Sequence, residues 1–318
     1  MMKKVSIFTP VFLAMIVIMA IFSWSIADDK PSPDASRVKV LSFNIRQAAV
    51  NDGENSWAHR KEMLADLVKS GHYDFIGLQE CLIHPDADKN QLEYLKTQLG
   101  EQYGFLAKCR EKDPNQGEAC AIFYDKTRWE LDADETGTFW LSESPDEPGS
   151  KSWDTACTRV VTWGRFTNQT TKESVYCYNT HFDHVSRLAQ AHGAIMLMNH
   201  IADRKHENDP VFLVGDFNCG EKSIPIQYLS GKPVTVEGKT RPAQKLLKDS
   251  YREVYPEVDE ASIATFHGFR GTPTGKEKID YIFVSPAVKT LGTEILKINR
   301  DGKYPSDHFP VEATFELK

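Results

Sequence analysis

Six short polar motifs carry residue types that suit metal-assisted chemistry on a phosphate, and each lies at or just beyond the end of an apolar, strand-like run. Phosphoester hydrolysis requires that charge on the phosphoryl oxygens be neutralised, that a water be activated and that the leaving oxygen be stabilised. Carboxylates, amides and histidines can perform these tasks, so the combination predicts a metal-assisted phosphoester hydrolase. The motifs are residues 42–45, 78–80, 179–181, 214–218, 278–283 and 306–311.

Acidic residues directly after two apolar runs are the predicted metal-binding and water-orienting groups. Glu80 follows the run 76–78, and Mg²⁺ prefers oxygen ligands, usually one or two carboxylates plus waters. Asp216 and Asn218 follow the run 212–215, and a spacing of two places their side chains on the same side of an extended chain. Both can then meet one water or phosphate, although this segment taken alone would also suit a simple β-turn.

Two histidines are the candidate proton-transfer groups, because imidazole exchanges protons near neutral pH. A carboxylate on the far nitrogen of a histidine fixes its tautomer and stabilises the imidazolium. Asp280 is predicted to hold His308 in this way, beside the adjacent Asp307. Glu118 is predicted to orient His181, the second candidate.

Two arginines, Arg110 and Arg159, lie in or beside predicted strands and could bind a phosphate through two parallel hydrogen bonds. Surface ion pairing is the alternative explanation for each. Among the other histidines, His184 and His267 lie near the motifs, and the rest are expected on the surface or on helices.

These side chains can act together only if a fold brings the strand ends to one place. Strand and helix patterns are mixed along the chain, which predicts one α+β layered domain from residue 38 to 318, after a linker at 28–37. The polar region 230–276 is interpreted as an insertion over one face, a common location of substrate specificity. Strands are predicted at 38–43, 75–78, 103–107, 119–124, 129–138, 158–166, 174–179, 211–214, 279–284 and 311–315, and helices at 57–70, 91–99 and 188–201.

Residues 1–27 have the pattern of an export signal. A basic start precedes the apolar stretch 11–22, and Ser25 and Ala27 suit a signal-peptide cleavage site before Asp28. The alternative is an uncleaved membrane anchor, since the segment is just long enough to span a bilayer, which needs about 20 residues. We expect cleavage and a periplasmic or extracellular protein.

Charge and cysteine content limit the partners and the cross-links. The net charge is −7, and removal of residues 1–27, which hold two lysines and no acid, leaves −9. Affinity for nucleic acid usually comes from lysine and arginine, so this acidity disfavours a nucleic-acid partner, and no protein partner is implied.

The six cysteines lack the CxxC spacing typical of zinc sites. Cys109 and Cys120 are a candidate disulfide, and small buried cysteines are the alternative.

The motifs together resemble the endonuclease/exonuclease/phosphatase superfamily, the DNase I-like metal-dependent phosphohydrolases, and in particular an exported bacterial branch. The resemblance covers essentially all of residues 38–318. It implies a four-layer α/β sandwich, with two packed mixed β-sheets flanked by helices and the site at their shared edge. The segments that carry it are residues 79–80, 215–218, 279–281 and 306–308.

The resemblance also implies a metal site and a water-orienting pair. Glu80 would bind Mg²⁺, with Mn²⁺ or Ca²⁺ as alternatives, and Asn44 and Asp307 would lie close to the metal or the phosphate. Asp216 and Asn218 would orient the attacking water and the scissile phosphate.

The remaining implied roles belong to the histidines. His308, held by Asp280, would act as a base or transition-state stabiliser. His181, with Glu118 behind it, would contact the phosphate or protonate the leaving group. Arg46 stands where some DNA-repair members carry a second acidic residue, which argues against that branch.

The substrate stays open at this level. Acidic charge and the lack of a lysine- or arginine-rich run favour a small or lipid-linked phosphoester, such as a sugar phosphate, over the DNA or RNA of an extracellular nuclease. A non-catalytic phosphate-binding module is a further alternative, although every core motif position is filled.

Overall fold

The computed structural model describes residues 36–242 and 247–317. The predicted signal peptide, residues 1–27, and almost all of the predicted linker lie outside the described residues. Among the helices that the structure describes, none is long and apolar enough to cross a membrane.

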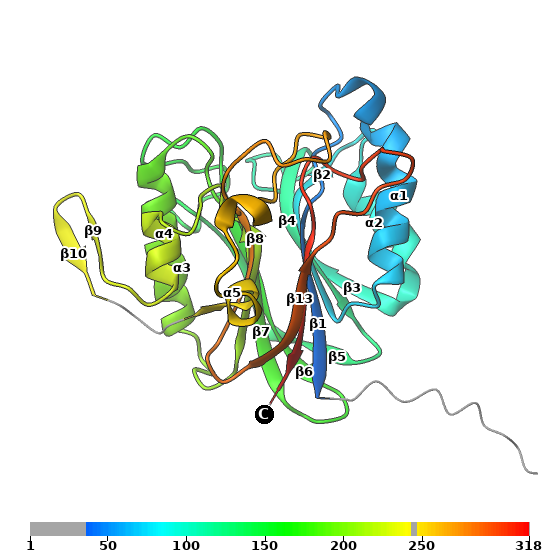
Figure 1. Cartoon of the computed structure of the whole chain (residues 1–318). Coiled ribbons are helices and arrows are strands. Elements are labelled where there is room, and N and C mark those ends of the chain that lie inside the picture. Colours follow the sequence, from blue (N-terminus) through cyan, green and yellow to red (C-terminus); the bar gives the residue numbers. More distant parts are fainter. Residues whose placement is uncertain (1–35, 243–246, 318) are drawn as a thin grey trace, which may run out of the picture. The chain divides into compact units, whose positions relative to one another are not determined.

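Two six-stranded mixed sheets pack face to face (Figure 1). The first sheet contains, in spatial order, β13 (Lys289–Ile295), β14 (Val311–Glu316), β1 (Arg37–Asn44), β2 (Phe75–Ile83), β4 (Gly117–Asp125) and β3 (Tyr103–Leu106). The second contains β11 (Lys248–Asp249), β12 (Asp280–Val284), β8 (Val211–Asp216), β7 (Ser174–His181), β6 (Val160–Asn168) and β5 (Trp129–Trp140).

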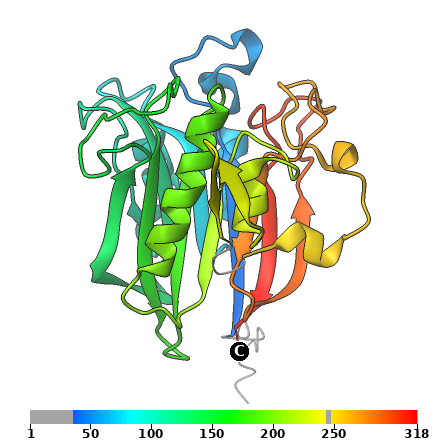
Figure 2. The same ribbon diagram turned by 90° about the vertical axis from the view of Figure 1, so that its left-hand side faces the viewer.

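Helices cover the outer face of each sheet, which completes four layers and confirms the predicted α+β sandwich. The first sheet is covered by α1 (Trp57–Ser70) and α2 (Gln91–Leu99), and the second by α3 (Arg187–Ala202) and α4 (Ile224–Leu229), as Figures 1 and 2 show. The short elements are the hairpin β9 (Val234–Val236) with β10 (Lys239–Arg241), the helix α5 (Ser250–Val254), and three 3₁₀ turns at Gly53–Asn55, Gly100–Gln102 and Glu260–Ile263.

Continuously apolar central strands produce this layering, because successive side chains point to opposite faces of a sheet. In β1, Val40 packs between the two sheets, whereas its neighbours Leu41 and Phe43 pack beneath α1 and α2. In β8, Phe212 faces the first sheet and Leu213 faces α3. Full burial of each such side chain contributes about 1.5–3 kcal/mol, so both faces of both strands anchor the sandwich.

The structure extends and corrects several predicted elements. β2 runs to Ile83, beyond the predicted end at residue 78, because a bulge carries the chain past Glu80 and lets pairing with β4 resume. The edge strand β13 was not predicted, since its Lys289–Ile295 segment is largely polar and contains a glycine. The region 230–276, predicted as loops, also holds β9, β10, β11 and α5.

The candidate disulfide between Cys109 and Cys120 is not present in the structure. All six cysteines lie in the described residues and each is unpaired. Cys157 is half-buried and the other five are buried, so the alternative of small buried side chains describes them better.

Candidate active site

The strand directions bring the predicted motifs to one edge of the sandwich. β1 pairs in parallel with β2, and β7 pairs in parallel with β8, so the carboxyl ends of all four strands lie at this edge. Asn44, His181 and Asp216 are the last residues of β1, β7 and β8, and Glu80 lies near the end of β2.

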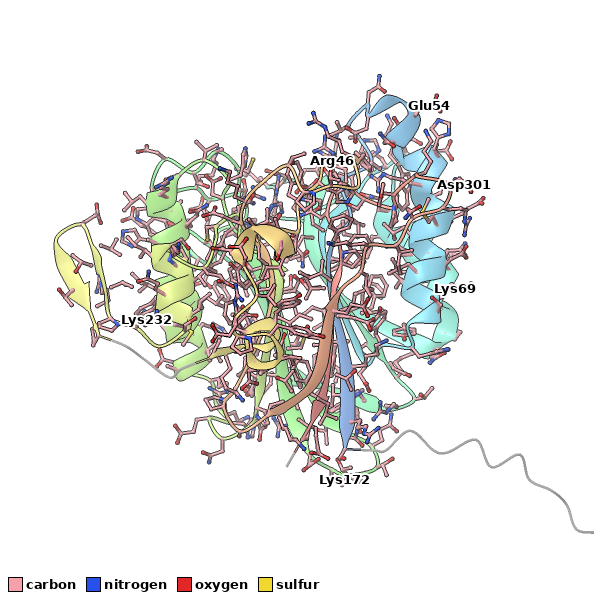
Figure 3. All side chains as sticks on the ribbon, in the orientation of Figure 1. Arg46, Glu54, Lys69, Lys172, Lys232 and Asp301 are labelled. Carbon is pink, nitrogen blue, oxygen red and sulfur yellow. The ribbon has the colours of Figure 1, made fainter. Side chains whose placement is uncertain are left out.

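Antiparallel neighbours bring their starting residues to the same edge. β12 runs antiparallel to β8 and begins at Asp280, while β14 runs antiparallel to β1 and is preceded by Asp307 and His308. Figure 3 shows Arg46, two residues beyond β1, at this upper edge, and Lys172, in the β6–β7 turn, at the opposite end. Six motifs dispersed over the chain therefore converge.

A polar bridge between the two sheets supports this edge from below. The Gln79 amide nitrogen donates to Asn179 Oδ1 at 2.7 Å. The Asn179 amide nitrogen donates to the carbonyls of Leu78 and Ala121 at 2.9 and 2.8 Å. Because both side chains are fully buried, these bonds fix the relative position of the sheets beneath the site.

A β-bulge presents Glu80 to the site. Its φ of +59° lies in the left-handed region, and the β2–β4 register shifts between Leu78 and Cys81. Asn44 Nδ2 donates to Glu80 Oε1 at 3.1 Å and to Asp216 Oδ2 at 3.0 Å, so one amide links carboxylates from both sheets. Left-handed backbone at a bulky polar residue is characteristic of functional sites.

The Glu80 carboxylate is held in its charged form. Burial by itself would raise its pKa, but hydrogen bonds from the Gln47 N–H and the Asn44 amide, with the nearby charges of His308 and Arg46, lower the pKa below its ordinary value. The Gln47 N–H bond is 3.0 Å long. Glu80 therefore offers a carboxylate rather than a carboxylic acid at neutral pH.

His308 and Asp280 form the predicted pair. His308 Nδ1 lies 2.9 Å from Asp280 Oδ2, and both side chains are buried. Burial would lower the pKa of His308, but the charges of Asp280, Asp216 and Asp307 and the bond to Asp280 raise it from 6.5 to about 10. His308 is consequently a cationic hydrogen-bond donor at neutral pH in the metal-free protein.

Asp216 lies at the centre of the site. Its Oδ2 is 3.8 Å from His308 Nε2 and 3.5 Å from His181 Nε2. Burial, and next the repulsion from Asp280, raise the pKa of Asp216 to about 7, although His308 and two hydrogen bonds oppose this. Its carboxyl group is thus poised to exchange a proton near neutral pH.

Asn218 reaches the site by a turn rather than by strand alternation. β8 ends at Asp216, and Asn218 has a left-handed φ of +52°. The Asn218 amide side chain donates to the Phe182 carbonyl at 3.0 Å, and its backbone N–H donates to Asp216 Oδ1 at 2.8 Å. The predicted pairing of the two residues at the site is present, but the extended-chain reason given for it is wrong.

The expected contact between Glu118 and His181 is not present. Arg110 takes both Glu118 oxygens, with distances of 2.6 and 3.0 Å. His181 Nδ1 is buried and has no hydrogen-bond partner among the described residues. Burial, followed by the charges of Arg159 and Arg110, holds the pKa of His181 well below 6.5, so its imidazole is neutral.

Asp307 lies beside the Glu80 network. Ser306 Oγ donates to the Asn44 carbonyl at 2.6 Å and lies 3.2 Å from Asp307 Oδ1. Asp307 Oδ2 is 3.7 Å from Arg46 Nε, and Arg46 also pairs with Asp52 through two bonds of 2.9 and 3.1 Å. Burial raises the pKa of the Asp307 carboxyl group, while His308, Arg46 and Arg60 act in the opposite direction.

A cavity of about 540 Å³ opens over these residues. This is within the range of small-molecule sites, about 300–1,000 Å³. Another groove, of about 520 Å³ beside α2, is lined by none of the predicted site residues. The residues that line the site cavity include Arg46, Asp52, Glu80, Arg110, Glu118, Arg159, His181, His184, Asp216, Asn218, Phe266, Phe269, Asp307 and His308.

Comparison with known proteins identifies the family of the chain that forms this cavity. A model of the Endonuclease/Exonuclease/phosphatase family matches residues 41–308, from β1 to the histidine of the dyad. The chain belongs to this family. Its members hydrolyse phosphoesters, so the predicted enzyme class, a phosphoric ester hydrolase, is confirmed at that level.

Three relatives illustrate the range of the Endonuclease/Exonuclease/phosphatase family. A member from Bacteroides vulgatus is 30% identical, with a TM-score of 0.75 over 89% of this chain and 99% of that chain. A mannosyl-6-phosphatase from Bacteroides thetaiotaomicron is 29% identical, with a TM-score of 0.74 over 88% of this chain and all of that one (100%). The Ccr4 3'-5'-exoribonuclease subunit of Kluyveromyces lactis is 24% identical over 82% of this chain, which spans only 38% of that relative's length.

Oxygen-rich residues around Glu80 fit the divalent metal typical of the family. Glu80 is ionised, and the carboxyl group of Asp307 adds further oxygens, which suits a hard cation such as Mg²⁺. The Asn44 amide nitrogen faces Glu80, while its oxygen accepts the Arg46 N–H at 3.0 Å, so Asn44 holds the Glu80 carboxylate in place. Asp216, Asp280 and His308 also place ligand atoms within 4.8 Å of one another. That second set fits less well, because a cation there would have to displace the proton that His308 shares with Asp280.

Arg60 is a site-supporting residue that the sequence reasoning missed. Its guanidinium is buried and donates to the carbonyls of Ile45 at 2.6 Å and Pro305 at 2.9 Å, which ties the segments that carry Asn44 and Ser306. Burial lowers the pKa of Arg60 to about 10. Its position on the apolar face of α1, between the buried residues Trp57 and Leu64, was an available signal.

The two other histidines that lie near the motifs, His184 and His267, occupy different positions relative to the cavity. His184 lines the cavity and contacts Arg159. His267 is buried behind the site, where its ring stacks on Phe309 at 3.9 Å and its backbone N–H bonds the Asp307 carbonyl at 2.9 Å. His184 therefore joins the residues that face a ligand, whereas His267 supports the segment that carries His308.

Proposed function

We propose that the protein is an exported, divalent-metal-dependent hydrolase of small or lipid-linked phosphoesters. The observation that carries the proposal is the cavity of about 540 Å³, which joins an ionised carboxylate, a cationic histidine and the buried Arg159. Similarity to a mannosyl-6-phosphatase and the acidic net charge both support a small phosphate-bearing substrate.

Glu80 and Asp307 would hold the cation, preferably Mg²⁺, and Asn44 would keep the Glu80 carboxylate in place. When bound, such an ion supplies charge neutralisation on phosphoryl oxygens and a fixed orientation of the substrate. Mn²⁺ and Ca²⁺ are alternatives, since all three ions accept oxygen ligands.

The protein groups divide the remaining chemical tasks between them. Asp216, with a pKa near 7, accepts the proton of the attacking water, which the Asn218 amide helps to orient. His308, kept protonated by Asp280, donates a hydrogen bond to the developing negative charge, so it acts as a stabiliser rather than as a base. Neutral His181, which also lines the cavity, contacts the phosphate.

A nuclease acting on RNA or DNA is the second candidate. The similarity to Ccr4, an exoribonuclease subunit, favours it. The net charge of −7 acts against it, because nucleic-acid affinity depends on neutralisation of phosphates by basic residues. A phosphate-binding module without activity is the third.

Metal-dependent hydrolysis of paired substrates tests the proposal. The chain from Asp28 is incubated with and without Mg²⁺ on a phosphomonoester and a phosphodiester, and His308→Ala is the matched variant. We expect Mg²⁺-dependent turnover that His308→Ala lowers by at least ~10²-fold, the usual effect of losing a donor that stabilises charge in the transition state. Preferential degradation of RNA or DNA would favour the nuclease, and absence of all turnover would favour the binding module.

Export rests on the pattern of residues 1–27 and has its own test. Expression of the full chain should release a protein whose N-terminus is Asp28, as measured by mass spectrometry of the secreted or periplasmic fraction. A full-length product in the membrane fraction would instead indicate an uncleaved anchor.

A further inference from the structure

Arg159 is a buried cation in the cavity wall whose hydrogen-bonding capacity is only partly used. Its side chain is 5% exposed and lines the cavity. Within the described residues, its Nε–H has no hydrogen-bond partner. A buried polar group without a hydrogen-bond partner destabilises the folded protein by about 1–3 kcal/mol, and by more when it is charged. A bound ligand that accepts this hydrogen bond would remove that cost.

The carboxylate closest to Arg159 is already occupied. Asp183 Oδ1 lies 3.9 Å from Arg159 Nε, too far for a hydrogen bond. That carboxylate accepts the N–H groups of Ala156 at 3.0 Å, Val185 at 3.0 Å and Ser186 at 2.7 Å. Asp183 therefore organises the loops around the site and compensates the charge of Arg159 only partly.

Arg110, on the same wall, differs in this respect. Its guanidinium binds both oxygens of Glu118, at 2.6 and 3.0 Å, and also Glu111 at 3.1 Å. Two acidic partners neutralise Arg110, so it is a structural support of the wall, and Arg159 supplies the uncompensated positive charge.

The neighbour of Arg159 adds a second donor. Arg159 Nη2 lies 3.2 Å from His184 Nδ1. Because a guanidinium can only donate, Nδ1 must be the acceptor, which leaves the proton of a neutral His184 on Nε2. His184 also lines the cavity, so an anionic group bound there meets the two side chains that carry the His184 Nε2–H and the Arg159 Nε–H.

We propose that Arg159 and His184 bind the terminal oxygen of a phosphomonoester and so make the site selective for monoesters over diesters. This inference rests on the proposed function and specifies its substrate class. A monoester has three non-bridging oxygens, whereas in a diester one of these is esterified and can neither carry the charge nor accept two strong donors. Selectivity then follows from leaving the buried Arg159 donor unpaired when a diester binds.

Paired kinetics with Arg159→Gln test the assignment. The mature chain with Mg²⁺ is assayed on 4-nitrophenyl phosphate and bis(4-nitrophenyl) phosphate, which differ in one ester bond. We expect Arg159→Gln to lower kcat/KM for the monoester by about 10- to 100-fold, the effect of losing a charge-assisted hydrogen bond, and to change that for the diester by less than about threefold. Arg159→Lys, which keeps the charge but loses the planar fork, should recover the monoester rate only in part.

A second ion-paired arginine, away from the site, provides the matched control. Arg165, in β6, is bound by Asp209 at 2.7 Å and Asp132 at 3.0 Å and does not line the cavity. Arg165→Gln should leave both rates unchanged. A parallel fall of both rates in Arg159→Gln, or no fall in either, would overturn the inference.

Orthophosphate binding separates this inference from the proposed function. If the wild-type protein hydrolyses neither compound, the proposed function fails on these substrates, and calorimetric titration of orthophosphate then decides the role of Arg159. A tenfold or greater loss of affinity in Arg159→Gln, about 1.4 kcal/mol, would support the binding role. Equal affinity in the two proteins would refute it.

Discussion

The substitution Asp280→Asn should lower the pKa of His308 toward the ordinary value of a histidine. The substitution preserves the shape of the side chain that lies 2.9 Å from His308 Nδ1, but it removes the negative charge. That charge is the largest of the influences that raise the pKa of His308 from 6.5 to about 10 against the effect of burial. The variant therefore isolates what the carboxylate contributes.

The size of the effect follows from Coulomb's law. Two unit charges about 4 Å apart attract by about 4 kcal/mol at an effective dielectric constant near 20. Since one pH unit corresponds to about 1.4 kcal/mol, the pKa of His308 should fall by about three, to near 7. Asp216, 3.8 Å from His308 Nε2, continues to raise the pKa and keeps it from falling further.

Titration of the imidazole Cε1–H resonance by NMR in the metal-free protein measures this directly. Stability provides a second readout. Because the pKa of His308 is higher in the folded protein than in the unfolded chain, protonated His308 stabilises the fold. This stabilisation is fully present below pH 6.5 and is lost as the pH rises through about 10. Wild-type free energy of unfolding should thus fall between these pH values through His308, and the fall should be much smaller in Asp280→Asn.

Two results would refute the reasoning. One is a wild-type His308 that titrates near 6.5, which would mean that the carboxylates do not control it. The other is an Asp280→Asn protein whose His308 still titrates near 10, which would assign the shift to Asp216 or Asp307 instead. Asp209→Asn, at a residue paired with Arg165 away from the site, is the control for general effects of charge.

Two further predictions concern the metal and the packing of the strands. Glu80→Gln should weaken Mg²⁺ binding by at least ~10-fold in calorimetry, whereas Glu62→Gln on the exposed face of α1 should not; equal affinity in Glu80→Gln would remove Glu80 from the metal site. Gly215→Ala would place its Cβ 2.5 Å from the Thr180 carbonyl oxygen on the neighbouring strand, and should lower the free energy of unfolding by about 1–3 kcal/mol in urea. Gly292→Ala, where a Cβ meets nothing within 4 Å, should be neutral, and equal stability of the two variants would contradict the packing argument.

Local patterns in the sequence determined the central architecture and the composition of the site. Continuous apolar runs predicted most of the central strands, and a polar residue directly after such a run marked Asn44, Glu80, His181 and Asp216. These signals are readable because hydrophobic periodicity and strand ends depend on residues close together in the chain. The pairing of His308 with Asp280 was also predictable, since both lie in motifs of a recognised combination.

Long-range packing decided the rest. Whether Glu118 meets His181 or Arg110 depends on the register of β4 against its neighbours and on a loop that no local pattern encodes. The protonation of His308 and Asp216 likewise comes from burial and from charges brought together by strands distant in sequence. The same is true of Arg159, for which the sequence allowed an ordinary surface ion pair. Only the tertiary structure buries its guanidinium without a full partner, because its nearest carboxylate is already bound by backbone N–H groups.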